Sequence, residues 1–358
     1  MPRTSKRSNS DALVDMHTVA RQANVSIATV SRTINRNPTV NPKMAKRVWS
    51  AIHDLGYMPN SQARALVSGR SGILGLIVSD ITNPFFPELI QGFEDVAVEN
   101  GYEILVSSTN YSPTRMESCI RRMLQRKAEG VAIMTFGIEQ PILKKLYDRN
   151  VPVVFVDVGP NVSNVKIVKV DYHAGIRQGV QHLAALGHRN IGFVSGPSDL
   201  RSAQMRVSAF KQSLAECGIK LYEDWLVCGE HTLQGGAQAM EQILATDHRP
   251  TAVMCSNDVS AIGVLHKAYR AGVRVPQDLS VVGFDDILAA RMMIPPLTSI
   301  EMSRVELART AVMALHALVE GHTDKCEYTI STKLVVREST SYPSGTMSDL
   351  PLLQKKGV

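Results

Sequence analysis

Residues 15–32 read DMHTVARQANVSIATVSR, and this stretch decides the fold of the amino-terminal end. Asp15 can cap a first helix, and Ser26 can cap a second helix that runs to about residue 35. Apolar residues recur on one face of each helix. Asn24 lies between them, where a tight turn needs the left-handed backbone that asparagine tolerates. The stretch therefore predicts two short helices joined by a turn, the pattern of a helix-turn-helix.

A third helix is expected to follow. Asn41 can cap it, and Pro42 suits its first position because proline has no N–H to leave unsatisfied there. Gly56 can end it in a left-handed conformation. We therefore expect an all-α domain at residues 15–58, preceded by a basic, disordered arm at residues 1–14.

Positive charge is concentrated at this end of the chain. Of the net charge of +6, residues 1–72 contribute +8, from 11 basic and 3 acidic residues, and the remainder contributes −2. Such asymmetry favours nucleic acid or another anionic surface as a partner. A solvated basic tail, or a three-helix bundle that binds protein, would be the structural alternative.

The second helix is the candidate recognition element. In a helix-turn-helix it enters the major groove of DNA, and its first residues meet base edges. An arginine can pair with guanine, methyl groups can contact thymine, and hydroxyl or amide groups suit phosphates. The candidates for base contacts are Ile27, Ala28, Thr29 and Arg32, and the candidates for backbone contacts are His17, Ser26, Ser31 and Asn35.

From Gly72 onward, short apolar runs alternate with amphipathic stretches that often end in glycine, which is typical of a parallel α/β sheet. Residues 72–340 are long for one sheet, so we expect two lobes with a break near residues 169–173. A helix near residues 300–320 is expected to cross back to the first lobe, and residues 341–358 are expected to be a disordered tail. The predicted strands are 73–78, 103–106, 131–134, 153–156, 191–194, 252–255 and 280–283.

Polar side chains follow the ends of these strands, where open α/β sheets bind their ligands. Carboxylates, amides and an arginine beside aromatic rings suit a sugar, whose hydroxyl groups need donors and acceptors and whose apolar face stacks on a ring. Asp258 and Asp286 are expected to be helix caps instead. The remaining candidates are Asp80, Asn83, Thr135, Asp157, Ser195, Asn257 and Asp285, with Phe85, Phe86 and Arg206 nearby.

Two long motifs resemble the lactose/galactose-repressor (LacI/GalR) family of bacterial transcription regulators. V19-A-R-Q-A-N-V-S-I-A-T-V-S-R32 is similar to its amino-terminal signature, and L55-G-Y-M-P-N60-S-Q-A-R-A-L66 to its continuation. Thr18 and Asn24 depart from the usual aspartate and glycine. The resemblance continues to about residue 340 through motifs such as H188-R-N-I-G-F-V-S-G-P and S280-V-V-G-F-D-D.

The resemblance implies an all-α helix-turn-helix domain followed by an α/β two-lobed effector domain like that of type I periplasmic binding proteins. It also implies that residues 59–71 form a hinge helix in the minor groove, where a leucine wedges a base step. A plain linker is the alternative there. The implied hinge contacts are Asn60, Ala63, Arg64 and Leu66.

The same resemblance implies which residues meet the effector. His231 stands where many relatives stack an aromatic residue on the ligand; an imidazole would add a hydrogen-bond partner that titrates near neutrality. The implied effector contacts are Phe85, Phe86, Asp157, Arg206, Asn257 and Asp285, with Asn83, Thr135 and His231 as further members.

Other classes of protein are disfavoured. The chain has no G-x-S-x-G, P-loop, H-E-x-x-H or dinucleotide fingerprint, so we expect neither an enzyme nor a cofactor. Its five scattered cysteines suggest no disulfide framework or metal site. Its first residues lack the apolar core of a secretory signal, and no apolar run approaches a membrane span. A cytoplasmic location is therefore expected.

Together these features predict a homodimeric repressor that binds double-stranded operator DNA. A small effector between the lobes, expected to be a carbohydrate, would control its operator affinity. Two alternatives stay open, namely a regulator controlled by a phosphoprotein corepressor and a plain sugar-binding protein.

Overall fold

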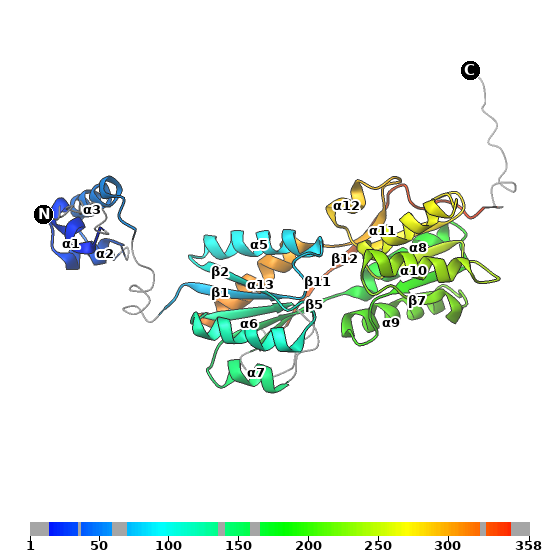
Figure 1. The fold of residues 1–358 in the computed structure, drawn as a ribbon, viewed down its shortest axis with the longest axis horizontal. Helices are drawn as coiled ribbons and strands as arrows, with labels where there is room; N and C mark the ends of the chain where they lie inside the picture. The colour runs from blue at the N-terminus through cyan, green and yellow to red at the C-terminus, as the bar shows by residue number, and fades with distance from the viewer. Residues whose placement is uncertain are drawn as a thin grey trace, which may run out of the picture. The chain divides into compact units, whose positions relative to one another are not determined.

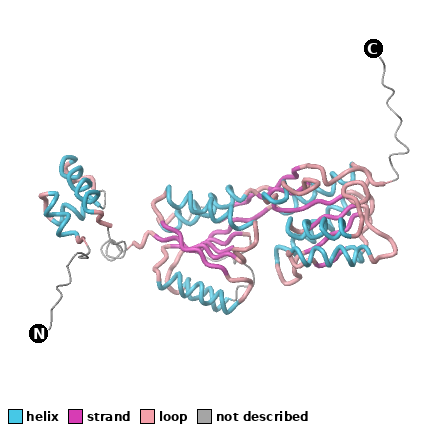
Figure 2. The backbone as a smooth tube through the Cα atoms, turned by 45° about the horizontal axis from the view of Figure 1, so that its top comes forward, coloured by secondary structure: helices cyan, strands magenta, loops and turns pink. Residues whose placement is uncertain are grey.

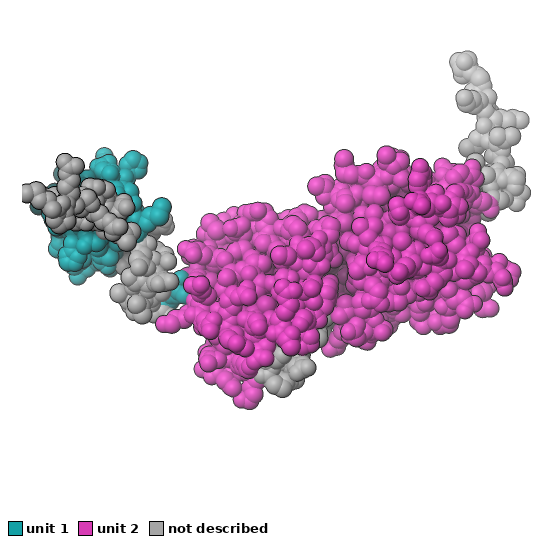
Figure 3. All heavy atoms as spheres, viewed as in Figure 1, with its two compact units in different colours: residues 1–71 teal, residues 72–358 magenta. Residues whose placement is uncertain are grey.

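The computed structural model describes residues 14–34, 37–58, 70–134, 140–157, 165–322 and 327–344. The chain divides into two compact units, residues 1–71 and 72–358, which Figure 3 shows in different colours. The expected arm, hinge and tail lie largely outside the described residues. The same is true of the site candidates Asn35, Asn60, Ala63, Arg64, Leu66 and Thr135.

The first unit contains three described helices, α1 (Met16–Ala23), α2 (Ile27–Ile34) and α3 (Pro42–Leu55) (Figure 1). The Asp15 carboxylate caps α1 by accepting a hydrogen bond from the Thr18 N–H at 2.8 Å. Asn24 ends α1 with a φ of 50°, the left-handed conformation that its turn position requires. The helices share a small apolar core of Val19, Ala20, Ala23, Val30, Val48 and Ala51.

The second unit contains two six-stranded sheets, each the centre of one lobe. In the first lobe the strand order is β11-β5-β4-β3-β1-β2, and all described pairings are parallel. The bounds are β1 (Ile73–Val78), β2 (Glu103–Ser108), β3 (Gly130–Met134), β4 (Val153–Val156), β5 (Val165–Val170) and β11 (Glu327–Ile330). Helices α5 (Phe85–Glu99) and α13 (Arg304–Val319) cover one face, and α6 (Pro113–Gln125) and α7 (Gln140–Tyr147) cover the other (Figure 1).

In the second lobe the strand order is β12-β10-β9-β8-β6-β7, parallel except for the antiparallel pair β10 and β12. The strands are β6 (Ile191–Ser195), β7 (Leu226–Cys228), β8 (Ala252–Cys255), β9 (Ser280–Asp285), β10 (Thr298–Met302) and β12 (Thr332–Val335). The helices are α8 (Tyr172–Ala185), α9 (Arg201–Glu216), α10 (Leu233–Leu244), α11 (Asp258–Arg270), α12 (Leu288–Arg291) and the 3₁₀ turn Glu223–Trp225. Helix α8 packs on α9, and α10 packs on α11.

Along the described residues the chain passes between the lobes three times, at Asp171, Ser303 and Ser331. Figure 2 shows the two sheets of this unit as separate groups of strands. The first and third passages are bonded to each other. The Asp171 N–H donates to the Ile330 carbonyl at 2.9 Å, and the Thr332 hydroxyl donates to the Asp171 carbonyl at 2.6 Å. Helix α13 returns to the first lobe after the second passage.

The carboxyl-terminal segment is tied to the second lobe beyond the boundary expected at residue 341. The Ser341 N–H donates to the Ser280 hydroxyl at 3.0 Å, and the Ser344 hydroxyl donates to the Gln277 carbonyl at 2.5 Å. Ser280 in turn contacts the buried ring of His188 at 3.0 Å. The described chain is therefore ordered to Ser344, because the segment satisfies buried polar groups of the lobe. Within the described residues, no helix has the length and apolar character to span a bilayer.

Candidate functional sites

Helix α2 presents one exposed face and one buried face. Val30 and Thr33 are buried against the other two helices. Ala28 and Arg32 are exposed, and Ile27 is 39% exposed. The described base-contact candidates thus share the open side of the helix, although Thr29 is half-buried. Their contact with DNA stays a prediction.

The start of α2 is held by its own hydroxyl groups. The Ser26 Oγ accepts a hydrogen bond from the Thr29 N–H at 3.2 Å and lies 2.9 Å from the Thr29 Oγ1. Ser26 therefore caps the helix, as its position in the sequence predicted. Of the other backbone candidates, His17 is exposed and Ser31 is half-buried.

A second candidate site lies between the two lobes of the second unit. A cavity of about 50 Å³ is lined from both sides, mostly by residues at the carboxyl ends of strands or just beyond them. The first lobe contributes Asn83, Phe85, Phe86, Tyr111, Met134 and Asp157, and the second contributes Tyr172, Ser202, Arg206, His231, Asn257, Asp285 and Met302. The structure thus brings the described effector candidates together, whereas Asp80 and Ser195 are not among the lining residues.

Arg206 occupies the centre of this site and is buried. Its guanidinium lies over the rings of Tyr172 and Phe284, at 4.6 and 4.4 Å from their centres. One nitrogen donates to the Ser256 carbonyl at 2.6 Å, and Nη2 lies 3.9 Å from a carboxylate oxygen of Asp285. Burial would lower the pKa of Arg206, but the Tyr172 hydroxyl and the neighbouring carboxylates outweigh it and raise that pKa. Arg206 is therefore a fixed cation whose Nε makes no hydrogen bond among the described residues.

Two buried carboxylates face the arginine. Asp157 follows β4, lines the cavity from the first lobe and has a φ of 84°. Neither of its carboxylate oxygens makes a hydrogen bond of normal geometry among the described residues. Burial raises its pKa, against the Tyr172 hydroxyl and Arg206, which lower it. Burial likewise raises the pKa of Asp285 to about 6. Both carboxylates therefore have unused capacity to accept hydrogen bonds from hydroxyl groups of a ligand.

His231 differs from what the sequence suggested. Its Nε2 lies 2.7 Å from the Ser256 hydroxyl. Burial, assisted by the charge of Arg206, lowers its pKa to about 3. The expectation that this imidazole titrates near neutrality is therefore wrong, because a buried ring beside a cation cannot take up a proton easily. His231 is instead a neutral hydrogen-bonding group in the wall of the site.

Asp258 and Asp286 are not helix caps, contrary to expectation. Asn257 caps α11 by accepting a hydrogen bond from the Ser260 N–H at 2.9 Å. Asp258 accepts from the Ser299 hydroxyl at 2.6 Å and from the Ile287 N–H at 2.9 Å. Asp286 is paired with Arg291 at 2.9 Å and with Arg337 at 2.5 Å. Both aspartates therefore hold the turn that carries Asp285.

Arg304 supports the same turn and was not anticipated from the sequence. It is buried at the start of α13, and its Nε donates to the Glu88 carboxylate of α5 at 2.7 Å. Its other two nitrogens donate to the carbonyls of Asp285 and, at 2.9 Å, Asp286. These two aspartates have φ values of 107° and 54°, which only strong local restraints maintain in residues other than glycine. Arg304 thus links a helix of the first lobe to a strained turn of the second.

Five lining residues were missed by the sequence analysis. Tyr111 follows β2 with a φ of 56°, and burial together with Asp80 and Asp285 raises its pKa to about 12. Met134 is the last residue of a predicted strand, so strand-end position could have identified it. No comparable signal marked the remaining three, which are Tyr172, Ser202 and Met302.

The volume of the cavity between the lobes limits which ligands it can hold. Sites for small ligands usually have volumes of roughly 300–1,000 Å³. At about 50 Å³ this cavity has room only for water. A sugar would enter only if the lobes separate or side chains such as Arg206 move. Within the described residues, no group of three or more His, Cys, Asp or Glu side chains is placed to hold a metal ion.

Both units match proteins that are already known. Residues 15–60 match the bacterial regulatory proteins of the lacI family, and residues 180–340 match the periplasmic binding protein-like domain. The catabolite control protein A of Priestia megaterium is 33% identical over 330 residues, which cover 91% of this chain and 99% of that protein.

Solved structures of similar proteins share this fold. A Lac repressor dimer bound to operator and the anti-inducer ONPF has a TM-score of 0.80 at 29% identity, covering 92% of this chain and 99% of that one. A complex of the transcriptional regulator CelR with cellobiose has a TM-score of 0.70 at 28% identity, covering 91% and 99%. The fold is thus a helix-turn-helix unit followed by a two-sheet α/β unit of the type I periplasmic-binding kind.

Proposed function

Because the chain belongs to the LacI family of bacterial regulatory proteins, we propose that it represses transcription from one operator under the control of a small ligand bound between its lobes. The relatives are DNA-binding transcriptional regulators and not enzymes, and we assign no catalytic role to this chain. In this proposal residues 15–58 bind DNA, residues 59–71 form the hinge, and residues 72–340 sense the ligand. The protein acts in the cytoplasm, where its operator lies.

The ligand proposal rests on one observation, the meeting of opposite charges from both lobes around the cavity. Asp157 comes from the first lobe, and Arg206 and Asp285 come from the second. A buried guanidinium beside the unbonded Asp157 carboxylate and the Asp285 carboxylate can bind several hydroxyl groups at once. Phe85 and Phe86 line the cavity, but both rings are buried in the core, so they offer only their edges to a ligand. A carbohydrate has several hydroxyl groups and an apolar face, so it matches both parts of this site. The CelR regulator, which has the same fold, was solved with cellobiose.

The control mechanism follows from the position of the cavity. A ligand that contacts both lobes favours the lobe arrangement in which its contacts are best made. The cavity has a volume of only about 50 Å³, so a ligand larger than water must change that arrangement to bind. If the hinge at residues 59–71 folds on DNA in only one arrangement, ligand binding and operator binding are coupled with equal strength in both directions.

A homodimer is part of the proposal, because two recognition helices would read the two halves of a near-palindromic site. Exposed apolar side chains near α12 support it. Leu288 is 70% exposed, Met292 is 76% exposed and Ile294 is 95% exposed. A monomeric protein seldom exposes such a group of large apolar side chains, whereas a partner subunit would cover them.

A two-stage experiment on the full-length protein tests this function. An operator is first selected from random duplexes, and sugars are then screened by thermal shift and by their effect on operator affinity at fixed salt. We expect one sugar to raise the melting temperature and change operator affinity several-fold. Arg206→Gln should abolish both responses while operator binding persists. Arg309→Gln, at an exposed position of α13, is the matched control.

The outcomes separate the candidate functions. Operator binding that responds to a phosphoprotein and to no sugar would favour the corepressor alternative. Sugar binding without any selected operator would indicate a plain sugar-binding protein. Loss of operator binding in Arg206→Gln would show that Arg206 is needed for folding, and would remove it as a ligand contact.

A further inference from the structure

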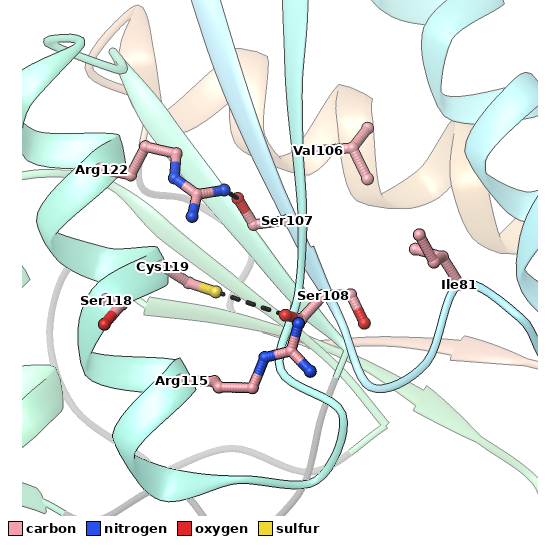
Figure 4. A pocket seen from close by; sticks show the side chains of 8 residues that line it. All are labelled: Ile81, Val106, Ser107, Ser108, Arg115, Ser118, Cys119 and Arg122. Atoms are coloured by element: carbon pink, nitrogen blue, oxygen red, sulfur yellow. Dashed lines mark hydrogen bonds between the residues drawn. The ribbon is translucent and has the colours of Figure 1, made fainter.

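A second cavity lies in the first lobe, away from the residues that line the effector cavity. It has a volume of about 380 Å³ and lies between α6 and β2, the edge strand of its sheet. Figure 4 shows its eight lining residues, which come from the strand, the helix and the loop after β1. They are Ile81, Val106, Ser107, Ser108, Arg115, Ser118, Cys119 and Arg122.

The charged side of this groove is made by two arginines. Arg115 and Arg122 are two turns apart on α6, and both side chains extend from the helix toward β2 (Figure 4). None of the eight lining residues is acidic. Within the described residues neither arginine forms an ion pair, whereas Arg121 on the same helix lies 3.8 Å from Glu117. The groove therefore has positive charge that no described carboxylate neutralises.

Hydroxyl groups add to this polar side. Arg122 donates to the Ser107 Oγ at 3.2 Å, and the Ser107 hydroxyl also lies within hydrogen-bonding reach of the Cys119 sulfur. Ser108 and Ser118 donate to backbone carbonyls at 3.2 and 3.3 Å and form polar walls. The Cys119 thiol is buried and donates to the Ser108 carbonyl at 3.7 Å. Burial raises the pKa of this thiol, so it adds no negative charge that would compete with an anion.

The rest of the lining is aliphatic. Ile81 is 50% exposed, and Val106 projects from the face of β2 opposite to Ser107 and packs against the core on that side. Guanidinium donors beside an exposed aliphatic side chain suit an anion that carries an organic group. Guanidinium groups bind phosphoryl oxygens through paired N–H donors, and this geometry is the strongest that arginine offers.

We propose that this groove is a second ligand site, which binds the phosphoryl group of a small phosphorylated molecule. Arg115 and Arg122 hold the phosphoryl oxygens, and Ile81 contacts the organic part. The volume exceeds the space of a phosphate ion alone. The site is separate from the cavity between the lobes and does not depend on the ligand proposed there.

Calorimetric titration of the full-length protein tests this site. The probes are inorganic phosphate and glucose 6-phosphate, each added at constant ionic strength against chloride. The test variant is Arg115→Gln/Arg122→Gln, and the matched control is Arg121→Gln, which removes a neighbouring arginine outside the groove. Because none of these changes touches the basic first unit, any binding of phosphate there is the same in all three proteins.

We expect the wild type and Arg121→Gln to bind both probes, and the double variant to bind at least about tenfold more weakly, since two charge-assisted contacts are lost. Tighter binding of glucose 6-phosphate would identify an organic phosphate as the ligand, and equal binding would identify the free anion. Equal affinity in all three proteins would overturn the proposal. A second result would also overturn it. If the double variant bound both probes as the wild type does but sedimented with a different degree of self-association, the groove would be an interface between copies of the chain.

Discussion

The imidazole of His231 lies against the Cα of Gly196 so closely that a Cβ at position 196 would come within 2.1 Å of its Nε2. The same nitrogen lies 2.7 Å from the Ser256 hydroxyl. The ring is therefore fixed from two sides, by a glycine that leaves it room and by a serine that bonds it. A glycine outside the cavity thus shapes the wall that a ligand would meet.

Gly196→Ala should displace His231 and remove the bond to Ser256. We expect a loss of stability of about 1–3 kcal/mol, the usual cost of overpacking, together with weaker sugar binding. Urea denaturation and titration with the sugar found by screening would measure the two effects. Ser256→Ala is the control, because it removes the bond and leaves space for the ring. Unchanged stability and sugar binding in Gly196→Ala would show that the His231 ring moves freely.

Arg304→Met should release the turn that carries Asp285. Two buried carbonyls lose their donor, so we expect a loss of about 2–4 kcal/mol in unfolding free energy. Glu88→Gln should cost about 1 kcal/mol or less, since the Glu88 side chain is 49% exposed and its partner keeps the two carbonyls. Equal losses in the two variants would mean that the ion pair, and not the contact with the turn, carries the stability.

The raised pKa of Asp285 predicts a pH dependence of stability. The folded protein holds this proton up to about pH 6, whereas the unfolded chain releases it near its ordinary value of 3.8. Between these values the folded state binds more protons, so the Asp285 contribution makes stability fall as pH rises. Asp285→Asn should remove this slope, gaining about 2–3 kcal/mol relative to the wild type between pH 3.5 and about pH 6.5. Urea denaturation of both proteins across this range would measure the difference, and a difference independent of pH would contradict the assignment.

His231 gives the opposite slope and serves as an internal check. Its pKa is lowered to about 3 in the folded protein, from an ordinary value of 6.5. The unfolded chain therefore binds more protons between these values, and the His231 contribution to stability is lost as pH falls. His231→Gln should become more stable relative to the wild type on acidification, whereas Asp285→Asn should become less stable relative to the wild type.

Arg32→Ala should weaken operator binding by roughly 1–3 kcal/mol and relax the preference at one base position. The reason is that Arg32 is exposed on the open side of α2 and can pair with a guanine. Anisotropy titrations against the selected operator and its single-base variants would measure this. Lys46→Ala, at an exposed position of α3, is the control for a general loss of charge. An equal loss on every sequence would place Arg32 on a phosphate.

The sequence predicted the elements that bury a continuous apolar face. Strands such as β1 and β9 were found because their apolar runs are bounded by glycine or polar residues, and α1 because its cap and turn residues fit one conformation. Strand β10 was missed because Ser299 and Glu301 interrupt its pattern; Ser299 is buried only because it donates to Asp258, a contact 41 residues away. Strand β5 was missed because two lysines break its apolar run.

The site was predictable to the extent that it follows from strand ends. Asp157, Asn257 and Asp285 lie at or just beyond the ends of predicted strands, so their convergence followed from the parallel topology. Arg304 could not be found in this way, because its importance comes from contacts with two elements remote in sequence. The neutral state of His231 also depended on burial, which the order of residues does not reveal.

The three passages between the lobes also determine how the second unit can deform. The first and third passages are bonded to each other at Asp171. The second passage, at Ser303, is followed by Arg304, which bonds to Glu88 of the first lobe. Short connectors of this kind would allow the lobes to rotate about them as a hinge while both sheets stay intact. A ligand in the cavity, whose residues Tyr172 and Met302 adjoin two of the connectors, would act with a short lever arm, and the far ends of the lobes would travel furthest. A small displacement at the cavity would thereby become a larger one at the ends of the lobes.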